Sequence, residues 1–434
     1  MSSFRPGRLV GILVGTIVIL GLGVYGPATL LGPLPSVSIK RLTPTGVDAF
    51  ATTPVLSQNG ASAIAVLSAT TSDASGTTST GLKSSDSASE AVPVPLAAAG
   101  SSEPLPMASI AKVVTALVVL DAQPFEPAED GPTVTLTAAD FQSYLNYDLA
   151  GARSVTVFAD EQWSERELLQ AMLLGSSNNH ADTLATWAFG SLEAYVVAAN
   201  AWLASNGLSS TTVVDATGLH DASAGTATDL AHLAGLAATD PIVSSILDRP
   251  SSALADRRGV ENTTAYLPEE GITGVSRSYT DAAGVCFLFT ATISEGDSNF
   301  TFSGAFVGEP TYDALTADLS ALMVSARAGV GPLPVLAAGD AYASFESAWG
   351  DTGSAVVGRS RTRYAWQAAK PDAATVTIDS FATARSGTNV GRVTLSVAGE
   401  SLSAALKLDD RISDPGLGWR LLHPIPMVTA LLNQ

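Results

Sequence analysis

The residues with the clearest chemical potential are Ser109 and Lys112, in the stretch PMASIAKVVTAL. Positions three apart share one face of a helix, so we expect the lysine amine beside the serine hydroxyl. An unprotonated lysine can take the hydroxyl proton and make the serine a nucleophile, provided that burial or a neighbouring cation lowers the lysine pKa. This spacing is also common between two surface residues, so the pair indicates catalysis only if other residues complete a site.

A second polar stretch, LLGSSNNHADTLA, places Ser176 and Asn178 directly after an apolar helix, on an expected loop between two helices. A serine hydroxyl can relay a proton, and an asparagine amide can orient a substrate carbonyl. The same residues are also typical of a turn or a helix cap. His180 and Asp182 suggest a Ser/His/Asp set, but no Gly-x-Ser-x-Gly turn accompanies them, so we interpret His180 as an ordinary helix residue.

The third stretch, GITGVSRSYTDAAG, has the pattern of a strand and is followed by the apolar run VCFLFTATI. Its candidate substrate-binding residues are Ser276, Arg277 and Ser278. Because side chains alternate along a strand, Arg277 is expected to point away from its neighbours as an exposed residue. A bulge or twist could re-aim the guanidinium, which would then bind a carboxylate through two hydrogen bonds.

In their order and spacing, these stretches resemble the serine-type D-alanyl-D-alanine carboxypeptidases, which are low-molecular-mass penicillin-binding proteins of the beta-lactamase/transpeptidase-like class. The likeness covers roughly residues 60–310 and includes Thr217-Gly218-Leu219 and GVENTTAYL. The resemblance implies an acyl-serine enzyme that acts on peptidoglycan stem peptides, binds beta-lactams and needs no cofactor.

The roles implied by the resemblance fall on the residues already singled out. Ser109 would attack the D-Ala-D-Ala carbonyl, with Lys112 as the base and Ser176 relaying the proton to the departing D-Ala. Asn178 would position the peptide. The catalytic set is therefore expected to be Ser109, Lys112 and Ser176.

The sequence departs from the family at its third motif, Lys-Thr-Gly, which aligns with Ser276, Arg277 and Ser278. The family lysine supplies positive charge near the nucleophile and helps to hold the terminal carboxylate of the substrate. Its loss predicts a weakened peptidase and leaves two alternatives open. One is an inactive relative that binds peptidoglycan or a cell-wall enzyme; the other is a hydrolase whose carboxylate pocket is reshaped by Tyr279 and Arg277 for a different substrate.

Helical patterns between an early strand and late strands predict an α+β domain with an antiparallel sheet over residues 60–330. Within it, residues 68–104 are rich in Ser, Thr and Gly and are expected to form a flexible insertion. Residues 34–59 are expected to be a connector, and residues 333–434 a small β-rich domain.

Residues 9–31 form an uncharged apolar run after Arg5 and Arg8, long enough to cross a bilayer. Residues 1–33 are therefore expected to be a cytoplasmic stub and a single-pass membrane anchor, with the later domains extracytoplasmic. A cleaved signal is the alternative.

The whole-chain composition excludes other classes of function. A formal charge of −19 argues against nucleic-acid binding. The four histidines lack a third ligand at useful spacing, so no metal site is expected. The single cysteine, Cys286, is expected to be a buried core thiol. No protein partner is indicated.

Overall fold

The computed structural model describes residues 13, 15–16, 19, 21–43, 53–72, 78–81, 94–248, 254–255, 258–295, 298–366, 374–397 and 400–432. The chain divides into two compact units. The larger unit comprises Ala49–Leu333 and Tyr364–Ala369, and the smaller comprises Met1–Asp48, Pro334–Arg363 and Lys370–Gln434. Every candidate site residue lies in the larger unit.

The larger unit is built on an antiparallel sheet in the order β12-β13-β14-β2-β3, with β4 also pairing with β2. Alternation along β13 gives the sheet two apolar faces, since Cys286 and Leu288 join one core while Phe287 and Phe289 join another. The strands are β2 (Ala61–Ser72), β3 (Thr78–Gly81), β4 (Val94–Gly100), β12 (Ile272–Thr280), β13 (Gly284–Glu295) and β14 (Ser298–Glu309).

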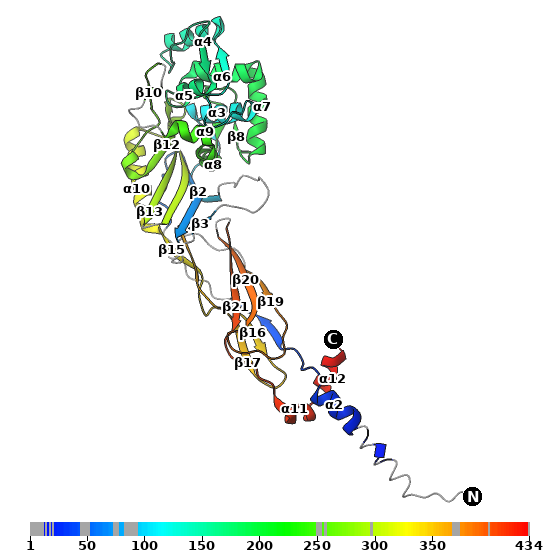
Figure 1. Cartoon of the computed structure of the whole chain (residues 1–434). Helices are drawn as coiled ribbons and strands as arrows, with labels where there is room; N and C mark the ends of the chain where they lie inside the picture. The colour runs from blue at the N-terminus through cyan, green and yellow to red at the C-terminus, as the bar shows by residue number, and fades with distance from the viewer. Residues whose placement is uncertain are drawn as a thin grey trace, which may run out of the picture. The chain divides into compact units, whose positions relative to one another are not determined.

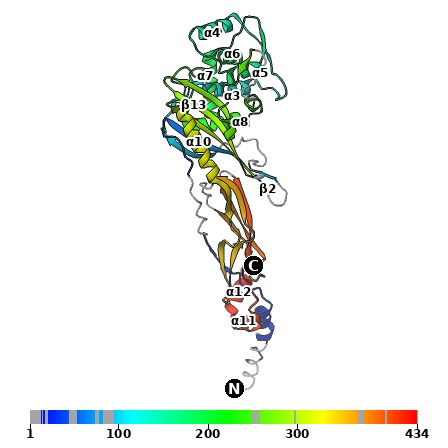
Figure 2. The ribbon, with the colours of Figure 1, turned by 90° about the vertical axis from the view of Figure 1, so that its left-hand side faces the viewer.

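One face of the sheet is covered by a group of helices, among which α8 packs on β14 and β2 (Figure 1). The helices are α3 (Ala111–Ala122), α4 (Ala138–Leu149), α5 (Glu165–Leu173), α6 (Asn178–Phe189), α7 (Leu192–Ser205), α8 (Ala227–Thr239) and α9 (Pro241–Leu247). The opposite face is covered by α10 (Tyr312–Gly329), whose Leu315, Leu319 and Leu322 belong to the same core as Phe287 (Figure 2). The predicted α+β domain with an antiparallel sheet is thus confirmed.

Short elements join these layers. They are the 3-10 turns η2 (Ala108–Ile110) and η3 (Pro268–Glu270), with the short strands β5 (Leu105–Pro106), β6 (Thr133–Thr135), β7 (Gln162–Ser164), β8 (Thr211–Thr212), β9 (Ala224–Gly225), β10 (Leu254–Ala255) and β11 (Val260–Glu261). Helix α5 is preceded by a capping box, in which the side chains of the N-cap Ser164 and of Glu167 accept hydrogen bonds from each other's backbone amides.

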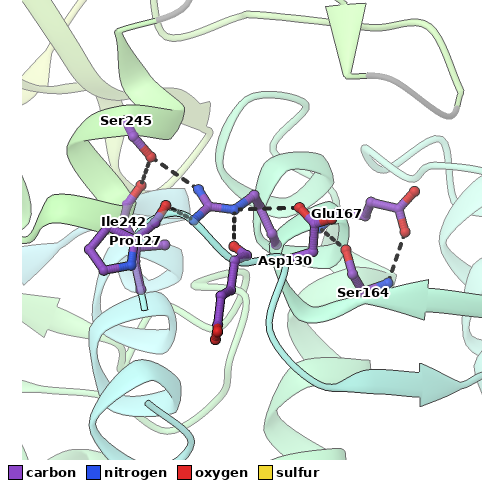
Figure 3. A network of polar contacts seen from close by, with 8 residues as sticks. Pro127, Asp130, Ser164, Glu167, Ile242 and Ser245 are labelled. Carbon is purple, nitrogen blue, oxygen red and sulfur yellow. Dashed lines mark hydrogen bonds and ion pairs between the residues drawn. The ribbon is translucent and has the colours of Figure 1, made fainter. Parts of the chain in front are cut away.

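A network of polar contacts around Ser164, Pro127 and Ser245 joins the start of α5 to its surroundings (Figure 3), and several of these contacts are made by Arg166. Its guanidinium donates to the carbonyl oxygens of Pro127 at 2.6 Å and Glu129 at 2.8 Å, and to Ser245 Oγ of α9 at 3.1 Å. Since α5 carries Met172 into the lining of the candidate site, this network helps to fix one wall of that site.

The smaller unit contains a six-stranded sheet in the order β1-β16-β17-β21-β20-β19. Its strands are β1 (Ser38–Arg41), β16 (Ala341–Glu346), β17 (Thr352–Val357), β19 (Thr375–Ile378), β20 (Asn389–Val397) and β21 (Glu400–Leu408). The π-helix η1 (Gly21–Tyr25) and the helices α2 (Gly26–Leu30), α11 (Gly416–Leu422) and α12 (Pro424–Leu432) accompany it. Two further strands, β15 (Val330–Leu336) and β18 (Arg361–Trp366), pair with each other.

Three boundaries differ from those predicted. The expected connector 34–59 contains β1, which pairs with β16. The sequence does not predict this strand, because its residues lack the alternation of apolar and polar side chains that is typical of strands. The expected insertion 68–104 contains the end of β2 together with β3 and β4, whose small residues pair through the backbone. The rest of that insertion, 73–77 and 82–93, lies outside the described residues. Finally, Trp366, from the predicted C-terminal domain, packs on Phe300 and Phe302 of the larger unit.

Within the described part of the chain, no single helix is both long and apolar enough to cross a bilayer. Helices α8 and α9, bent by 92°, meet the length and composition criterion only as a pair, and most of their residues are buried. Of the predicted anchor, 9–31, residues 9–12, 14, 17–18 and 20 lie outside the described residues.

Candidate active site

The candidate nucleophile, Ser109, lies in η2, immediately before α3. Its neighbour Ala108 has a left-handed backbone with φ of 46°, a strained conformation of the kind found at functional sites. The turn is held by Gly218, where an added Cβ would lie only 1.8 Å from the Ala108 carbonyl oxygen. The two backbones therefore touch, and only glycine fits at this point.

Lys112 stands beside Ser109, as the spacing predicted. Its side chain is buried, with 2% of its surface exposed. Nζ lies 2.8 Å from Ser109 Oγ and donates to the Thr217 carbonyl oxygen at 2.9 Å. The amine is thus held between the nucleophile and a fixed acceptor, which is the geometry a general base requires.

The electrostatic surroundings of Lys112 favour its neutral form. Burial lowers the Lys112 pKa from its ordinary 10.5 to about 7. Asp215 and Asp182 raise this pKa, and Arg153 lowers it. A large share of Lys112 is therefore unprotonated near neutral pH, although the lysine of the third motif is missing.

Asp215 organises the loop that supplies the Thr217 carbonyl. Its carboxylate accepts hydrogen bonds from Thr217 Oγ1 at 2.6 Å, the Leu219 amide at 3.0 Å and Ser223 Oγ at 2.6 Å. Sequence reasoning missed Asp215, although an aspartate two residues before Thr-Gly is typical of a side chain that closes a turn on its own backbone. Asp215 thus positions the acceptor of Lys112.

Ser176 and Asn178 differ in their relation to the nucleophile. Ser176 has a left-handed backbone with φ of 55° and lines the same cavity as Ser109 and Lys112. Asn178 begins α6, is not among the residues that line this cavity, and donates through N and Nδ2 to the Arg153 carbonyl oxygen at 3.0 and 2.9 Å. Asn178 Oδ1 is buried with no partner in the described chain.

His180 has a structural role. Its Nδ1 lies 2.8 Å from Ser177 Oγ, and its ring packs at 5.0 Å on Trp163. Burial lowers the His180 pKa, so the ring is neutral. Asp182 accepts from Tyr147 Oη at 2.8 Å. The structure therefore places no Ser/His/Asp set here, in agreement with the sequence interpretation.

Ser276 and Ser278 lie on the face of β12 that packs toward the nucleophile. The register shifts between Gly274 and Ser276, after which Ser276 pairs with Leu288 and Ser278 with Cys286. Both of those partners belong to the helix-side core, which also contains Ala108. Ser276 lines the cavity, while Ser278 Oγ is buried without a partner among the residues described.

Arg277 lies on the other face, as strand alternation predicted, but it is not the exposed residue expected. Nε donates to the Thr263 carbonyl oxygen at 3.0 Å, and the guanidinium lies 5.0 Å over the Tyr266 ring. These contacts half-bury the side chain. Arg277 is among the residues that line the cavity, but its guanidinium is already engaged by the Thr263 carbonyl oxygen and the Tyr266 ring.

An open cavity brings the candidate residues together. It is lined by Ser109, Lys112, Val113, Met172, Leu173, Ser176, Thr263, Thr264, Val275, Ser276 and Arg277. A nucleophile, a base and a relay hydroxyl thus share one cavity, an arrangement suited to acyl transfer. In the described ranges, no group of three or more His, Cys, Asp or Glu side chains is placed to hold a metal ion.

Comparison with known proteins places this site in a family context. The family model described as D-alanyl-D-alanine carboxypeptidase, Peptidase_S11, matches residues 86–301. The D-alanyl-D-alanine endopeptidase of Pseudomonas aeruginosa is 29% identical over 209 residues, which are 46% of this chain and 64% of that protein. The D-alanyl-D-alanine carboxypeptidase DacB2 of Mycobacterium tuberculosis is 31% identical over 193 residues, or 43% of this chain and 62% of that protein.

The match thus spans less than two thirds of each of these two relatives. Among solved structures, penicillin binding protein 5 from Haemophilus influenzae aligns with a TM-score of 0.55 at 18% identity. That alignment covers 83% of this chain and 99% of the other, so the fold is shared.

Proposed function

We propose that this chain is a serine peptidase of D-Ala-D-Ala bonds in peptidoglycan stem peptides, because the family model described as D-alanyl-D-alanine carboxypeptidase matches residues 86–301. The observation that carries the proposal is the buried Ser109–Lys112 pair, 2.8 Å apart, with the Lys112 pKa lowered to about 7. Burial thus supports the base in the absence of the cation that the third motif provides elsewhere in the family.

The proposed reaction has two steps. Ser109 Oγ attacks the D-Ala carbonyl while Lys112 Nζ takes its proton, and the backbone amides of Ser109 and of β12 near Ser278 or Tyr279 stabilise the oxyanion. The C–N bond then breaks as Ser176 passes its hydroxyl proton to the departing amine and takes the proton held by Lys112, which leaves an ester on Ser109 and a neutral Lys112. Water hydrolyses this ester, the Lys112 amine again serving as base, and Ser109 is restored.

A second candidate function is an inactive relative that binds peptidoglycan or a cell-wall enzyme. The changed third motif favours it, because neither Ser276 nor Ser278 carries charge and the Arg277 guanidinium is engaged elsewhere. Against it, Ser109 and Lys112 keep a geometry that a binding protein does not need.

Intact-protein mass spectrometry after incubation with a beta-lactam separates these candidates. The proposal predicts a mass increase of one drug molecule that is absent in Ser109→Ala. If the folded protein forms an adduct neither with a beta-lactam nor with a D-Ala-D-Ala depsipeptide, the second candidate, an inactive binding protein, would be favoured.

The proposal includes location in the cell membrane. Residues 9–31 would form an uncleaved anchor with both folded units extracytoplasmic, supported by the preceding Arg5 and Arg8. A further support is the apolar surface of the smaller unit, whose exposed large side chains include Leu31, Leu417, Leu422, Ile425, Val428, Leu431 and Leu432. Carbonate extraction of membranes, with mass measurement of the mature protein, tests the anchor. The anchor would be contradicted if carbonate released the mature protein and its mass showed that residues 1–33 had been cleaved off.

A further inference from the structure

The β12 residues that line the cavity are Val275, Ser276 and Arg277, and the hydroxyl group among them is that of Ser276. Ser276 lines the cavity together with Ser109 and Ser176. Ser278, two residues along the same face of β12, is buried and its Oγ has no partner in the described chain. A buried hydroxyl without a partner is costly unless a ligand supplies one.

The two basic residues that line the cavity are both engaged. Lys112 Nζ contacts Ser109 Oγ and the Thr217 carbonyl oxygen. The Arg277 guanidinium is held by the Thr263 carbonyl oxygen and the Tyr266 ring. A carboxylate entering this cavity would therefore lose its hydration without gaining a charged partner, which is strongly unfavourable.

Negative charges near Lys112 also disfavour a carboxylate in this cavity. Asp182 and Asp215 are close enough to raise the Lys112 pKa, so two carboxylates already act on the site. Arg153, in contrast, lowers the Lys112 pKa. Its backbone oxygen accepts from Asn178, which places the residue beside the start of α6 and not on β12.

We infer that the site selects substrates in which the residue after the scissile bond ends in a neutral carboxamide, in place of a free carboxylate. This inference rests on the proposed peptidase function. The chemistry of the wall fits it, since a hydroxyl both donates and accepts hydrogen bonds and a carboxamide does the same, whereas a carboxylate only accepts. Ser276 is thus a specificity-determining residue.

The test compares two peptides that differ in one group, acyl-L-Lys-D-Ala-D-Ala and the same peptide with a C-terminal carboxamide. Release of D-alanine or D-alaninamide by the full-length protein in detergent gives kcat/KM for each. We expect the carboxamide to be favoured by at least about tenfold. A clear preference for the acid would overturn the inference.

Matched variants locate the preference. Ser276→Lys places a cation on the cavity face and is expected to shift the ratio toward the acid by at least about tenfold. Thr273→Lys adds the same charge to an exposed position of β12 and is expected to leave the ratio unchanged. Equal shifts in both variants would overturn the assignment to Ser276, because they would report a general charge effect.

Failure of the inference and failure of the proposed function are distinguishable. If benzylpenicillin labels Ser109 and the acid peptide is still preferred, the peptidase function stands and the inference falls. In that outcome, Arg153→Ala shows whether Arg153 binds the carboxylate, by loss of the acid preference. If neither peptide is cleaved and no adduct forms, both the function and the inference fall.

Discussion

The two walls of the cavity have been altered to different degrees. The wall formed by η2, α3 and the loop around Thr217 keeps its nucleophile, its base and a close backbone contact between Ala108 and Gly218. The wall formed by β12 carries Ser276, Arg277 and Ser278 at the positions that the resemblance aligns with Lys-Thr-Gly. The comparison indicates that nucleophile activation and substrate-carboxylate recognition are separable, since burial is the largest cause that lowers the Lys112 pKa.

The largest expected effect is on the first wall, at the base. Lys112→Met keeps an apolar side chain of similar length but cannot accept a proton, so acylation by benzylpenicillin should slow by about 10³-fold. Thermal unfolding checks that the variant is folded. A folded Lys112→Met protein that acylates at the original rate would show that Lys112 is not the base.

Gly218→Ala tests the backbone contact that holds the same wall. An added Cβ would lie 1.8 Å from the Ala108 oxygen, so we expect a loss of at least about 3 kcal/mol in unfolding free energy and slower acylation. Gly190→Ala is the matched control, because φ is also positive there but no atom lies within 4 Å of the added Cβ. Equal destabilisation of the two variants would show that the contact between Gly218 and Ala108 is not the cause of the loss in stability.

On the second wall, Arg277→Ala should affect stability more than activity. Loss of the Thr263 hydrogen bond and the Tyr266 contact should cost about 1–2 kcal/mol in unfolding free energy. The acylation rate should stay within about threefold of the original, because the guanidinium faces away from Ser109. A selective loss of acylation without a change in thermal stability would assign Arg277 to substrate binding.

The smallest expected effect is that of Arg153→Ala. Arg153 lowers the Lys112 pKa, so its removal raises that pKa and reduces the neutral fraction of Lys112. At pH 6.5 the acylation rate of Arg153→Ala should be about twofold below that of the original protein. High salt should reduce this difference between the two rates, because it screens the charge of Arg153. Arg153→Lys retains the charge and should keep the original rate; a similar loss in both variants would point to a role other than charge.

The sequence predicts the local features of the site well. The spacing of Ser109 and Lys112 places them on one helical face, and the apolar runs after residue 284 predict the pair β13 and β14, because both signals lie within one element. The family resemblance drawn from these motifs is confirmed by the model match over residues 86–301.

The missed features depend on residues that are distant in the sequence. The Thr217 carbonyl oxygen accepts a hydrogen bond from Lys112, which lies 105 positions earlier in the sequence. Arg277 packs on Tyr266 and Thr263 through tertiary contacts, which the periodicity of a sequence does not indicate. The same is true of β1, whose partner β16 is about 300 residues away and whose exposed polar residues give no strand pattern.

The most direct test of the central claim is the pH dependence of Ser109 acylation, measured by intact mass on the full-length protein with Ser109→Ala as the control. If burial keeps Lys112 neutral, the rate should rise about tenfold per pH unit at low pH and level off near a pKa of about 7. The sign follows from the base role, because only the deprotonated amine can accept the Ser109 proton. A rate that keeps rising toward pH 10, or folded protein that forms no adduct at any pH, would contradict the account.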